Sequence, residues 1–277
     1  MQDAFAYCAE LVRAADRDRF IAALFAPAER RGALHALYAF NVEITRVREL
    51  AREPLAGEIR LQWWSDVLNG ERREEAGANP VAAALLETIA RYDLAAANLT
   101  DLIEAHRFDL YDEPMAGIAD LESYAARTSS VLIALAAQIL GVDAAGAAEP
   151  AGIAYGITRL LRSLPLHAAR HQLYVPIDLL ARHGVTPHDV FAAQSSGDLA
   201  AALAQLRDLA RRHLAAAHTA IWALPPRALP AFLPIALVRP WLDRLEGCDP
   251  FAPADIAPWR RQWLIWRAAR NPGRIAG

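Results

Sequence analysis

Apolar side chains recur every three to four residues along most of the chain, which is the period of an α-helix with one buried face. The pattern predicts a long helix that begins near Ala26-Pro27 and runs to about Leu50. Further helices are predicted over residues 99–111, 120–140, 150–163, 197–222 and 258–270. A chain of this kind belongs to the all-α class.

Polar and proline residues mark several helix ends. Asn79-Pro80 predicts a start, because proline at the first helical position loses no hydrogen bond there. Thr186-Pro187-His188-Asp189 has the spacing of a capping box. Only residues 172–176 favour an extended piece, which Pro176 closes. The proline-dense stretch 225–240 is also rich in Leu, Ala and Phe, so we expect it to form short helical turns that pack against the rest of the protein. We expect a single domain over residues 1–277.

The composition is that of a globular protein. Of the 277 residues, 55% are hydrophobic and 22% are charged, which excludes a disordered chain and a polytopic membrane protein. The two cysteines, Cys8 and Cys248, form no disulfide framework and indicate a reducing compartment. Acids interrupt the N-terminal apolar positions, and Thr128–Val142 is too short to span a bilayer. We expect a cytoplasmic protein, soluble or peripheral at the inner membrane.

Charge is divided unevenly between the two halves of the chain. Residues 1–150 hold 14 arginines against 24 acids, whereas residues 151–277 hold 15 arginines against 8 acids, and lysine is absent. The second half therefore favours anions and the first repels them. Because the arginines form no run with interleaved aromatic residues, we expect no nucleic-acid binding.

Common cofactor and hydrolase motifs are absent from the sequence, including GxGxxG, the Walker A loop, GxSxG and HExxH. The nearest metal-like spacing is His167 and His171, which would share a face if one helix carried both. No carboxylate or cysteine lies close enough in sequence to complete a ligand set. We therefore expect no metal and no cofactor.

Five segments together resemble the squalene/phytoene synthase family, in the order in which that family has them. They are Leu34–Phe40, Leu61–Trp64 with Leu68, Tyr124–Ser130, Gly152–Arg162, and Leu173–Leu180 with Gly184-Val185. The resemblance covers about residues 20–240. It implies a single-domain helical bundle of the isoprenoid-synthase type around a central cavity.

Enzymes of that family act on prenyl diphosphates, and they hold Mg²⁺ with aspartates at i and i+4 on two facing helices. Here the first of these motifs reads Thr45-Arg46-Val47-Arg48-Glu49, and the second reads Ser163-Leu164-Pro165-Leu166-His167. Only Glu49 is an acid, and one carboxylate is a poor site for a cation that prefers several oxygen ligands. We expect Mg²⁺-dependent prenyl transfer to be lost.

This pattern of losses resembles the branch of the family that includes the mitochondrial complex I assembly factor. The resemblance is carried by Phe40–Glu43, Arg60–Trp64 and Leu161–His167. It implies a binding or assembly protein that is peripheral at the inner membrane, with respiratory-complex subunits as partners.

Arginines flank both degenerate motifs and are candidates for holding a prenyl diphosphate or another anionic lipid-like ligand without metal. Guanidinium groups pair bidentately with phosphate oxygens. The candidates are Arg46, Arg48, Arg159, Arg162, His167 and Arg170, with His171 beside them. The alternative is that these arginines form ion pairs with Glu43, Glu49 or surface acids.

A second hypothesis is an active prenyl-diphosphate transferase that uses other acids and Mg²⁺. Its candidates are Asp109 and Asp112, spaced i and i+3 at the C-terminal end of the predicted 99–111 helix, and Asp109-Leu110 resembles a cavity-lining element of the family.

The predicted last helix, within residues 258–277, is basic and rich in tryptophan. Trp259, Trp263 and Trp266 share one helical face, and the arginines of this segment are Arg260, Arg261, Arg267, Arg270 and Arg274. We expect the tryptophans to pack on the bundle with the arginines outward, because a core-facing helix shows the same period. The alternative is contact with a membrane surface.

Overall fold

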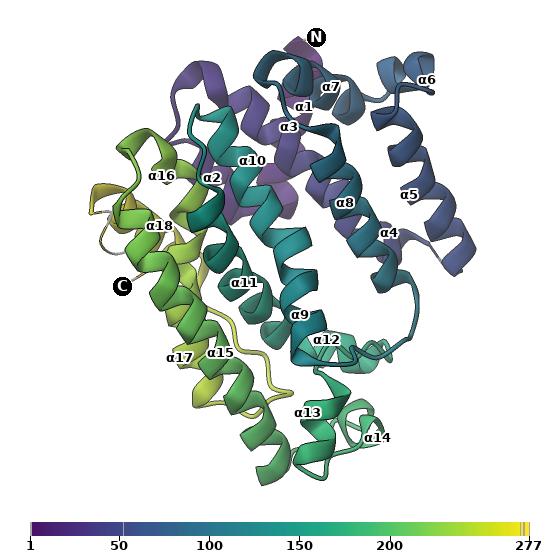
Figure 1. Ribbon diagram of the computed structural model, residues 1–277, viewed down its shortest axis with the longest axis vertical. Helices are drawn as coiled ribbons and strands as arrows, with labels where there is room; N and C mark the ends of the chain where they lie inside the picture. Colours follow the sequence, from purple (N-terminus) through teal and green to yellow (C-terminus); the bar gives the residue numbers. More distant parts are fainter. Residues whose placement is uncertain (1, 52, 272, 274, 277) are drawn as a thin grey trace.

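Helices account for the regular structure of the computed structural model, which describes residues 2–51, 53–271, 273 and 275–276 and has no β-strand in those ranges. They form an elongated bundle (Figure 1). The α-helices are α1 (Gln2–Ala15), α2 (Arg17–Ala23), α3 (Ala28–Thr45), α4 (Val47–Leu50), α5 (Pro54–Leu68), α6 (Arg73–Ala78), α7 (Pro80–Tyr92), α8 (Ala96–His106), α9 (Ile118–Ala125), α10 (Val131–Ile139), α11 (Ala145–Arg162), α12 (Leu164–Ala169), α13 (Ile177–Arg182), α14 (Pro187–Phe191), α15 (Gly197–Trp222), α16 (Leu229–Phe232), α17 (Val238–Glu246) and α18 (Pro258–Arg270).

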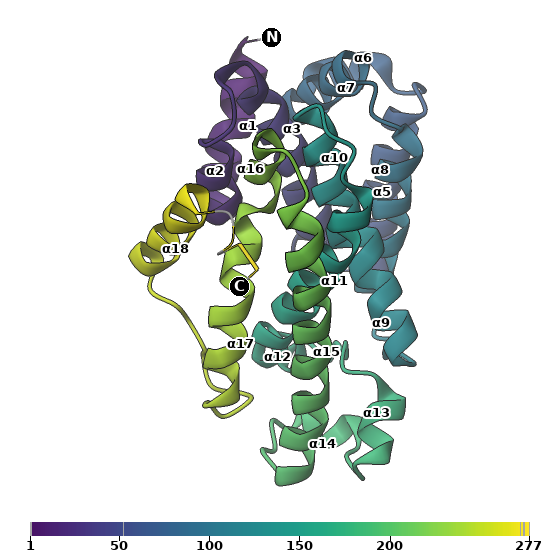
Figure 2. The same ribbon diagram turned by 60° about the vertical axis from the view of Figure 1, so that its left-hand side comes forward.

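Helix α11 is the central element of the bundle and contacts α15, α9 and α10. Figure 2 shows these helices side by side after a 60° turn. A close approach on α11 requires glycine: a Cβ atom added at Gly152 would lie 2.2 Å from the Cα atom of Ser130. The Ser130 hydroxyl donates a hydrogen bond of 2.7 Å to the Glu149 carbonyl, which fixes this contact. The centre of the fold is therefore tightly packed.

The predicted helices are present, but three of them are interrupted. The helix expected to run to Leu50 ends at Thr45, and α4 continues after Arg46. The 120–140 helix contains a π-helical turn at Ala126–Ser130, and the 99–111 helix ends at His106 and continues as a 3₁₀ turn over Arg107–Leu110. All three interruptions lie where side chains turn toward the cavity described below or toward α11.

The predicted helix starts are confirmed by their caps. The Asn79 side chain accepts from the backbone N–H groups of Val81 and Ala82 at 2.9 and 3.1 Å. Thr186 and Asp189 form the reciprocal capping box at the start of α14. Pro226, Pro230 and Pro234 lie in short 3₁₀ and α turns, and residues 229–238 around Phe232 are buried, as expected for a packed segment.

Residues 172–176 do not form a strand, which corrects the expectation of an extended element. The segment is buried and irregular. The Met115 N–H donates to the Leu173 carbonyl at 2.9 Å, whereas the Gln172 N–H donates to the His167 carbonyl of the preceding helix, also at 2.9 Å. These backbone hydrogen bonds do not form a β-ladder in the described residues.

The orientation expected for the last helix is also wrong. In α18 the side chains of Leu264, Ile265 and Ala268 face the bundle, while the three tryptophans are exposed. Branched and small aliphatic residues fit the narrow space against the neighbouring helices, which leaves the bulky indole groups outside. Arg274 lies outside the described residues.

Candidate functional site

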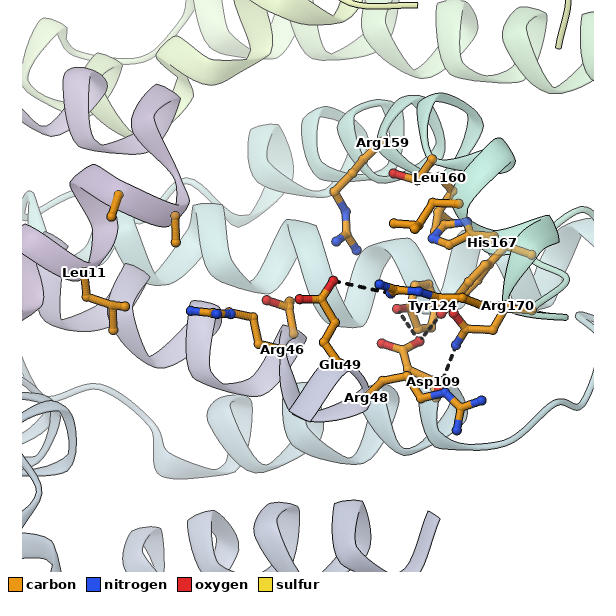
Figure 3. A pocket seen from close by; sticks show the side chains of 17 residues that line it. Leu11, Arg46, Arg48, Glu49, Asp109, Tyr124, Arg159, Leu160, His167 and Arg170 are labelled. Carbon is orange, nitrogen blue, oxygen red and sulfur yellow. Dashed lines mark hydrogen bonds and ion pairs between the residues drawn. The ribbon is translucent and has the colours of Figure 1, made fainter. Parts of the chain in front are cut away.

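A cavity of about 570 Å³ lies between α1, the α3–α4 junction, the 3₁₀ turn at 107–110, and the α11–α12 junction. Figure 3 shows its side chains from close by. Leu11, Ala14 and Ala15 of α1 form an apolar wall, and Leu160 and Leu166 add apolar surface elsewhere. The rest of the lining is mainly polar or charged, which is typical of a site for a ligand with a charged group.

The four positions expected to correspond to the family's aspartates all line this cavity. Thr45 and Glu49 come from the α3–α4 junction, and Ser163 and His167 come from the α11–α12 junction. The family resemblance therefore located two facing walls of the cavity. The hydroxyl of Thr45 donates to the backbone carbonyls of Asn41 and Val42, at 2.9 and 3.2 Å, so it is used within its own helix.

Four of the five candidate arginines line the cavity: Arg46, Arg48, Arg159 and Arg170. Arg162 does not. Its guanidinium carbon lies 3.5 Å from the ring centroid of Trp241, on another side of α11. Arg162 follows Arg159 by three positions on α11, and its contact with Trp241 of α17 holds its side chain outside the cavity.

Two of the cavity arginines form ion pairs, as the alternative interpretation expected. Arg170 Nη1 lies 3.3 Å from Glu49 Oε1. Arg48 Nη2 lies 3.0 Å from Asp112 Oδ1, and Arg48 also donates to the Leu110 carbonyl. Both contacts hold their guanidinium groups at the rim of the cavity.

Arg46 and Arg159 differ from these two. Neither has an acidic partner within 4 Å among the residues that the structure describes. In Figure 3, Arg159 enters the cavity from one wall, and Arg46 and Glu49 come from the opposite one. Their positive charge is therefore available to a ligand.

Asp109 is the most buried acid of the cavity. Its Oδ1 atom accepts hydrogen bonds from the hydroxyls of Tyr124 and Tyr174, at 2.8 and 2.6 Å, and His106 Nδ1 lies 2.7 Å from Oδ2. Burial raises the pKa of Asp109, but the neighbouring His106 and the three hydrogen bonds outweigh burial and hold the pKa below its usual value. The carboxylate is thus ionised, and its oxygens are already engaged.

The shifted pKa values of the neighbouring groups make each of these side chains uncharged near pH 7. Burial, and then the charge of Asp109, raises the pKa of Tyr124 and of Tyr174 well above the usual value, so both hydroxyls remain donors. Burial and the nearby Arg159 lower the pKa of His167 to about 4, so its imidazole is neutral near pH 7. The positive charge of the cavity comes from arginine alone.

Asp109 and Asp112 do not act together, which corrects the expectation of an i, i+3 acidic pair on one helix. The helix ends at His106, and only Asp109 lines the cavity, while Asp112 is exposed and pairs with Arg48. The tyrosines that bind Asp109 were missed as functional residues. Tyr124 and Tyr174 lie in two of the segments that carry the family resemblance, and that placement was the available signal.

The cavity does not fit a magnesium cluster. Its two carboxylates are Glu49, which is paired with Arg170, and Asp109, which is saturated by hydrogen bonds. In the ranges that the structure describes, no three His, Cys, Asp or Glu side chains come together as a metal ion requires. His167 and His171 do not share a helical face, because α12 ends at Ala169 and His171 has a φ of 55°.

An all-helical bundle with a charged cavity between two helix junctions agrees with the isoprenoid-synthase type of fold that the sequence resemblance implied. The family model for squalene/phytoene synthase matches residues 12–267, and the chain belongs to this family. The complex I assembly factor 6 of Rattus norvegicus is 31% identical over 250 residues, which cover 89% of this chain and 75% of the relative. Phytoene synthase 1 of Arabidopsis thaliana is 26% identical, with 89% and 61% covered.

Solved structures agree on the fold. A dehydrosqualene synthase in complex with a ligand superposes with a TM-score of 0.81 at 17% identity, and the match covers 97% of this chain and 96% of that one. None of the described helices has both the length and the apolar character needed to cross a bilayer.

Proposed function

We propose that this protein binds an anionic, prenyl-diphosphate-like ligand without metal and acts as an assembly factor for a respiratory complex. The observation that carries the binding proposal is the pair Arg46 and Arg159. Both line the cavity and lack an acidic partner among the described side chains. A multiply charged phosphate group would supply that partner.

The chemistry of arginine explains why metal is dispensable. Each guanidinium presents several N–H donors in a plane and stays charged at any physiological pH, so two or three of them can neutralise a diphosphate. With four arginines against two carboxylates and a neutral His167, the cavity carries excess positive charge. Mg²⁺-dependent ionisation would instead need clustered carboxylates. Binding without that ion would leave intact the carbon–oxygen bond that joins the prenyl chain to the diphosphate.

The assembly role is supported by relatives rather than by the cavity. The rat relative is named as a complex I assembly factor, and its match extends over most of both chains. We infer that this chain has respiratory-complex subunits as partners and that it works at the inner membrane, where such a complex is built.

The binding proposal is tested by thermal shift with inorganic pyrophosphate, farnesyl diphosphate and geranylgeranyl diphosphate, each with Mg²⁺ or with EDTA. We expect stabilisation that survives EDTA, and no pyrophosphate release above a boiled control. Arg159→Ala removes the free guanidinium and should abolish the shift, whereas Arg73→Ala, an exposed arginine on α6, is the matched control. Stabilisation only with Mg²⁺ would contradict the proposal.

The assembly proposal needs a separate test in the native host. Deletion of the gene should lower the amount of assembled complex I and the rate of NADH oxidation by isolated membranes, and a plasmid copy should restore both. Unchanged complex I in the deletion strain would overturn this part and leave the binding result standing.

The second candidate is an active prenyl-diphosphate transferase, favoured by the ionised Asp109 inside the cavity and by the similarity to phytoene synthase 1. It predicts turnover of farnesyl or geranylgeranyl diphosphate with Mg²⁺ and a loss of that turnover in Asp109→Asn and Glu49→Gln. The assay above distinguishes the two candidates directly.

A further inference from the structure

Helix α18 has two faces of different character. Leu264, Ile265 and Ala268 are buried against α2 and the 3₁₀ turn at Leu233–Leu237. On the opposite side, Trp259 is 70% exposed, Trp263 is 46% exposed and Trp266 is 47% exposed. The helix lies at the edge of the molecule in both views (Figures 1 and 2).

Three exposed tryptophans on one helix face are unusual for a surface that meets only water. Indole groups bury a large apolar area when they find a partner, and a contiguous apolar patch marks an interaction site. The spacing of four and three residues aligns the three rings along the helix. The face is therefore one continuous apolar stripe, and about half or more of each of its three side chains is exposed.

Arginines accompany the stripe. The guanidinium carbon of Arg267 lies 4.5 Å from the ring centroid of Trp263, and that of Arg270 lies 5.0 Å from the ring of Trp266. Arg260 is exposed beside them. Such cation–π contacts hold the charged groups at the level of the rings.

The helix carries no acid to balance these charges. Arg261 alone is neutralised, by an ion pair of 2.7 Å with Asp18 of α2 on the buried side. The nearest acid before the helix is Asp255, in the preceding loop. The outer face thus carries tryptophans and arginines and no acidic side chain.

We propose that α18 lies flat on an anionic phospholipid surface, with its tryptophans among the headgroups and its outer arginines paired with lipid phosphates. Tryptophan prefers the interface between headgroups and acyl chains, because its ring is apolar and its N–H group is polar. A helix of 13 residues is too short to span a bilayer but long enough to lie in the interface plane. Negative lipid headgroups complement the uncompensated arginines.

The proposal is independent of the cavity and of the assembly role. Its test is flotation of the full chain with vesicles of phosphatidylcholine alone, or of phosphatidylcholine with about one-third phosphatidylglycerol. We expect binding to the anionic vesicles, a blue shift of tryptophan emission on binding, and loss of binding when salt is raised to about 0.5 M.

Two variants separate the contributions of the rings and the charges. W259A/W263A/W266A should lower the partition coefficient at least tenfold, a rough estimate from the apolar area removed. R260Q/R270Q should lower it by roughly 30-fold on anionic vesicles, because each arginine near the surface contributes about a factor of five. All five side chains are exposed, so the circular dichroism and melting temperature should stay those of the wild type.

Matched controls lie elsewhere on the molecule. L55A/I59A removes two apolar side chains, 71% and 63% exposed, from α5, at the opposite edge of the bundle in both views. R73Q/R91Q removes the same charge from α6 and α7. Both controls should bind vesicles like the wild type.

Failure of the wild type to bind anionic vesicles would overturn the proposal, as would unchanged binding by the triple tryptophan variant. A protein surface is the competing occupant. If the wild type ignores vesicles but forms a dimer that the triple variant does not form, the stripe is a self-association face and the membrane proposal is wrong.

Discussion

Arg170 reaches across the cavity to Glu49, and the two side chains, 121 residues apart in sequence, meet at 3.3 Å. This contact joins the two walls that the family resemblance expected to carry magnesium ligands. Glu49, the only acid at the four motif positions, therefore pairs with Arg170. The Glu49 carboxylate competes with any anionic ligand for the Arg170 guanidinium.

The competition predicts that Glu49→Gln strengthens anion binding. Loss of the carboxylate frees Arg170 and removes a repelling charge, and a half-exposed pair of this kind contributes up to about 1 kcal/mol. Calorimetry with pyrophosphate in EDTA should show an affinity about fivefold higher. Glu74→Gln, an exposed acid on α6, is the control for net charge, and an equal gain in both variants would show that the pair is irrelevant.

Arg159 and Arg162 lie three residues apart but should behave differently. Arg159→Gln should weaken pyrophosphate binding by roughly tenfold to a hundredfold, the range expected for a lost charge-assisted hydrogen bond. Arg162→Gln should leave binding unchanged and lower the melting temperature, because its guanidinium stacks on Trp241. Equal effects of the two substitutions on affinity would contradict the placement of Arg162 outside the cavity.

Restoring the acids should restore a metal response. In T45D/E49D/S163D/H167D four carboxylates would line the two facing walls, and Mg²⁺ favours such oxygen ligands. We expect a Mg²⁺-dependent thermal shift in this variant and none in the wild type. Asparagine at the same four positions is the control for size, and a Mg²⁺ response in the wild type would disagree with the poor fit of its cavity to the ion.

His35 makes stability depend on pH. Burial, with a smaller contribution from Arg31, lowers the pKa of His35 to about 4, and its Nε2 atom has no hydrogen-bond partner. In the unfolded chain the pKa returns to about 6.5. The unfolded state therefore binds more protons between these values, so this contribution is complete above about pH 6.5 and is lost as the pH falls toward 4.

His35→Phe should flatten that dependence. The ring of Phe20 stacks on His35 at 5.3 Å, so an aromatic replacement retains the contact. Urea unfolding at pH 7 and near pH 4.5 should show a smaller loss of free energy in the variant, by up to about 3 kcal/mol. His188→Gln, at an exposed site, should lose as much stability as the wild type. An unchanged slope in His35→Phe would assign the acid sensitivity to other groups.

Gly152→Ala should destabilise the fold strongly. The added Cβ atom would meet backbone atoms of Ser130 at 2.2 and 2.3 Å, so the π-helical turn or α11 must move, at a cost of about 3 kcal/mol. Gly146→Ala in the same helix has no neighbour within 4 Å and should stabilise by about 1 kcal/mol. Thermal denaturation of both variants tests the contact, and similar melting temperatures would speak against it.

Periodicity and capping residues predicted most of the helices, because those signals are local. Asn79 and Thr186 cap the helices that they were expected to cap. The breaks at Arg46 and at 126–130 were not predictable, since each follows from packing against distant segments. Residues 172–176 were taken for a strand because a buried apolar run has no period that distinguishes a strand from irregular backbone.

The sequence was sufficient to predict which segments line the cavity, but not which side chains contact one another there. The family resemblance placed Thr45, Glu49, Ser163 and His167 around one cavity. It could not show that Arg162 turns away or that Tyr124 and Tyr174 converge on Asp109, because both depend on side-chain directions set by tertiary packing. The last helix was misjudged for a related reason: the aliphatic and tryptophan faces have the same period, and only the space available in the bundle decides which one is buried.

The ion pair between Asp18 and Arg261 connects the last helix to the part of the fold that forms the cavity. It fastens α18 to α2, and α2 leads through a short turn into α3, which ends at Thr45 on the cavity wall. The last helix is therefore connected to the cavity wall through two consecutive helices. If α18 is held on a surface, this connection influences the direction in which the cavity opens.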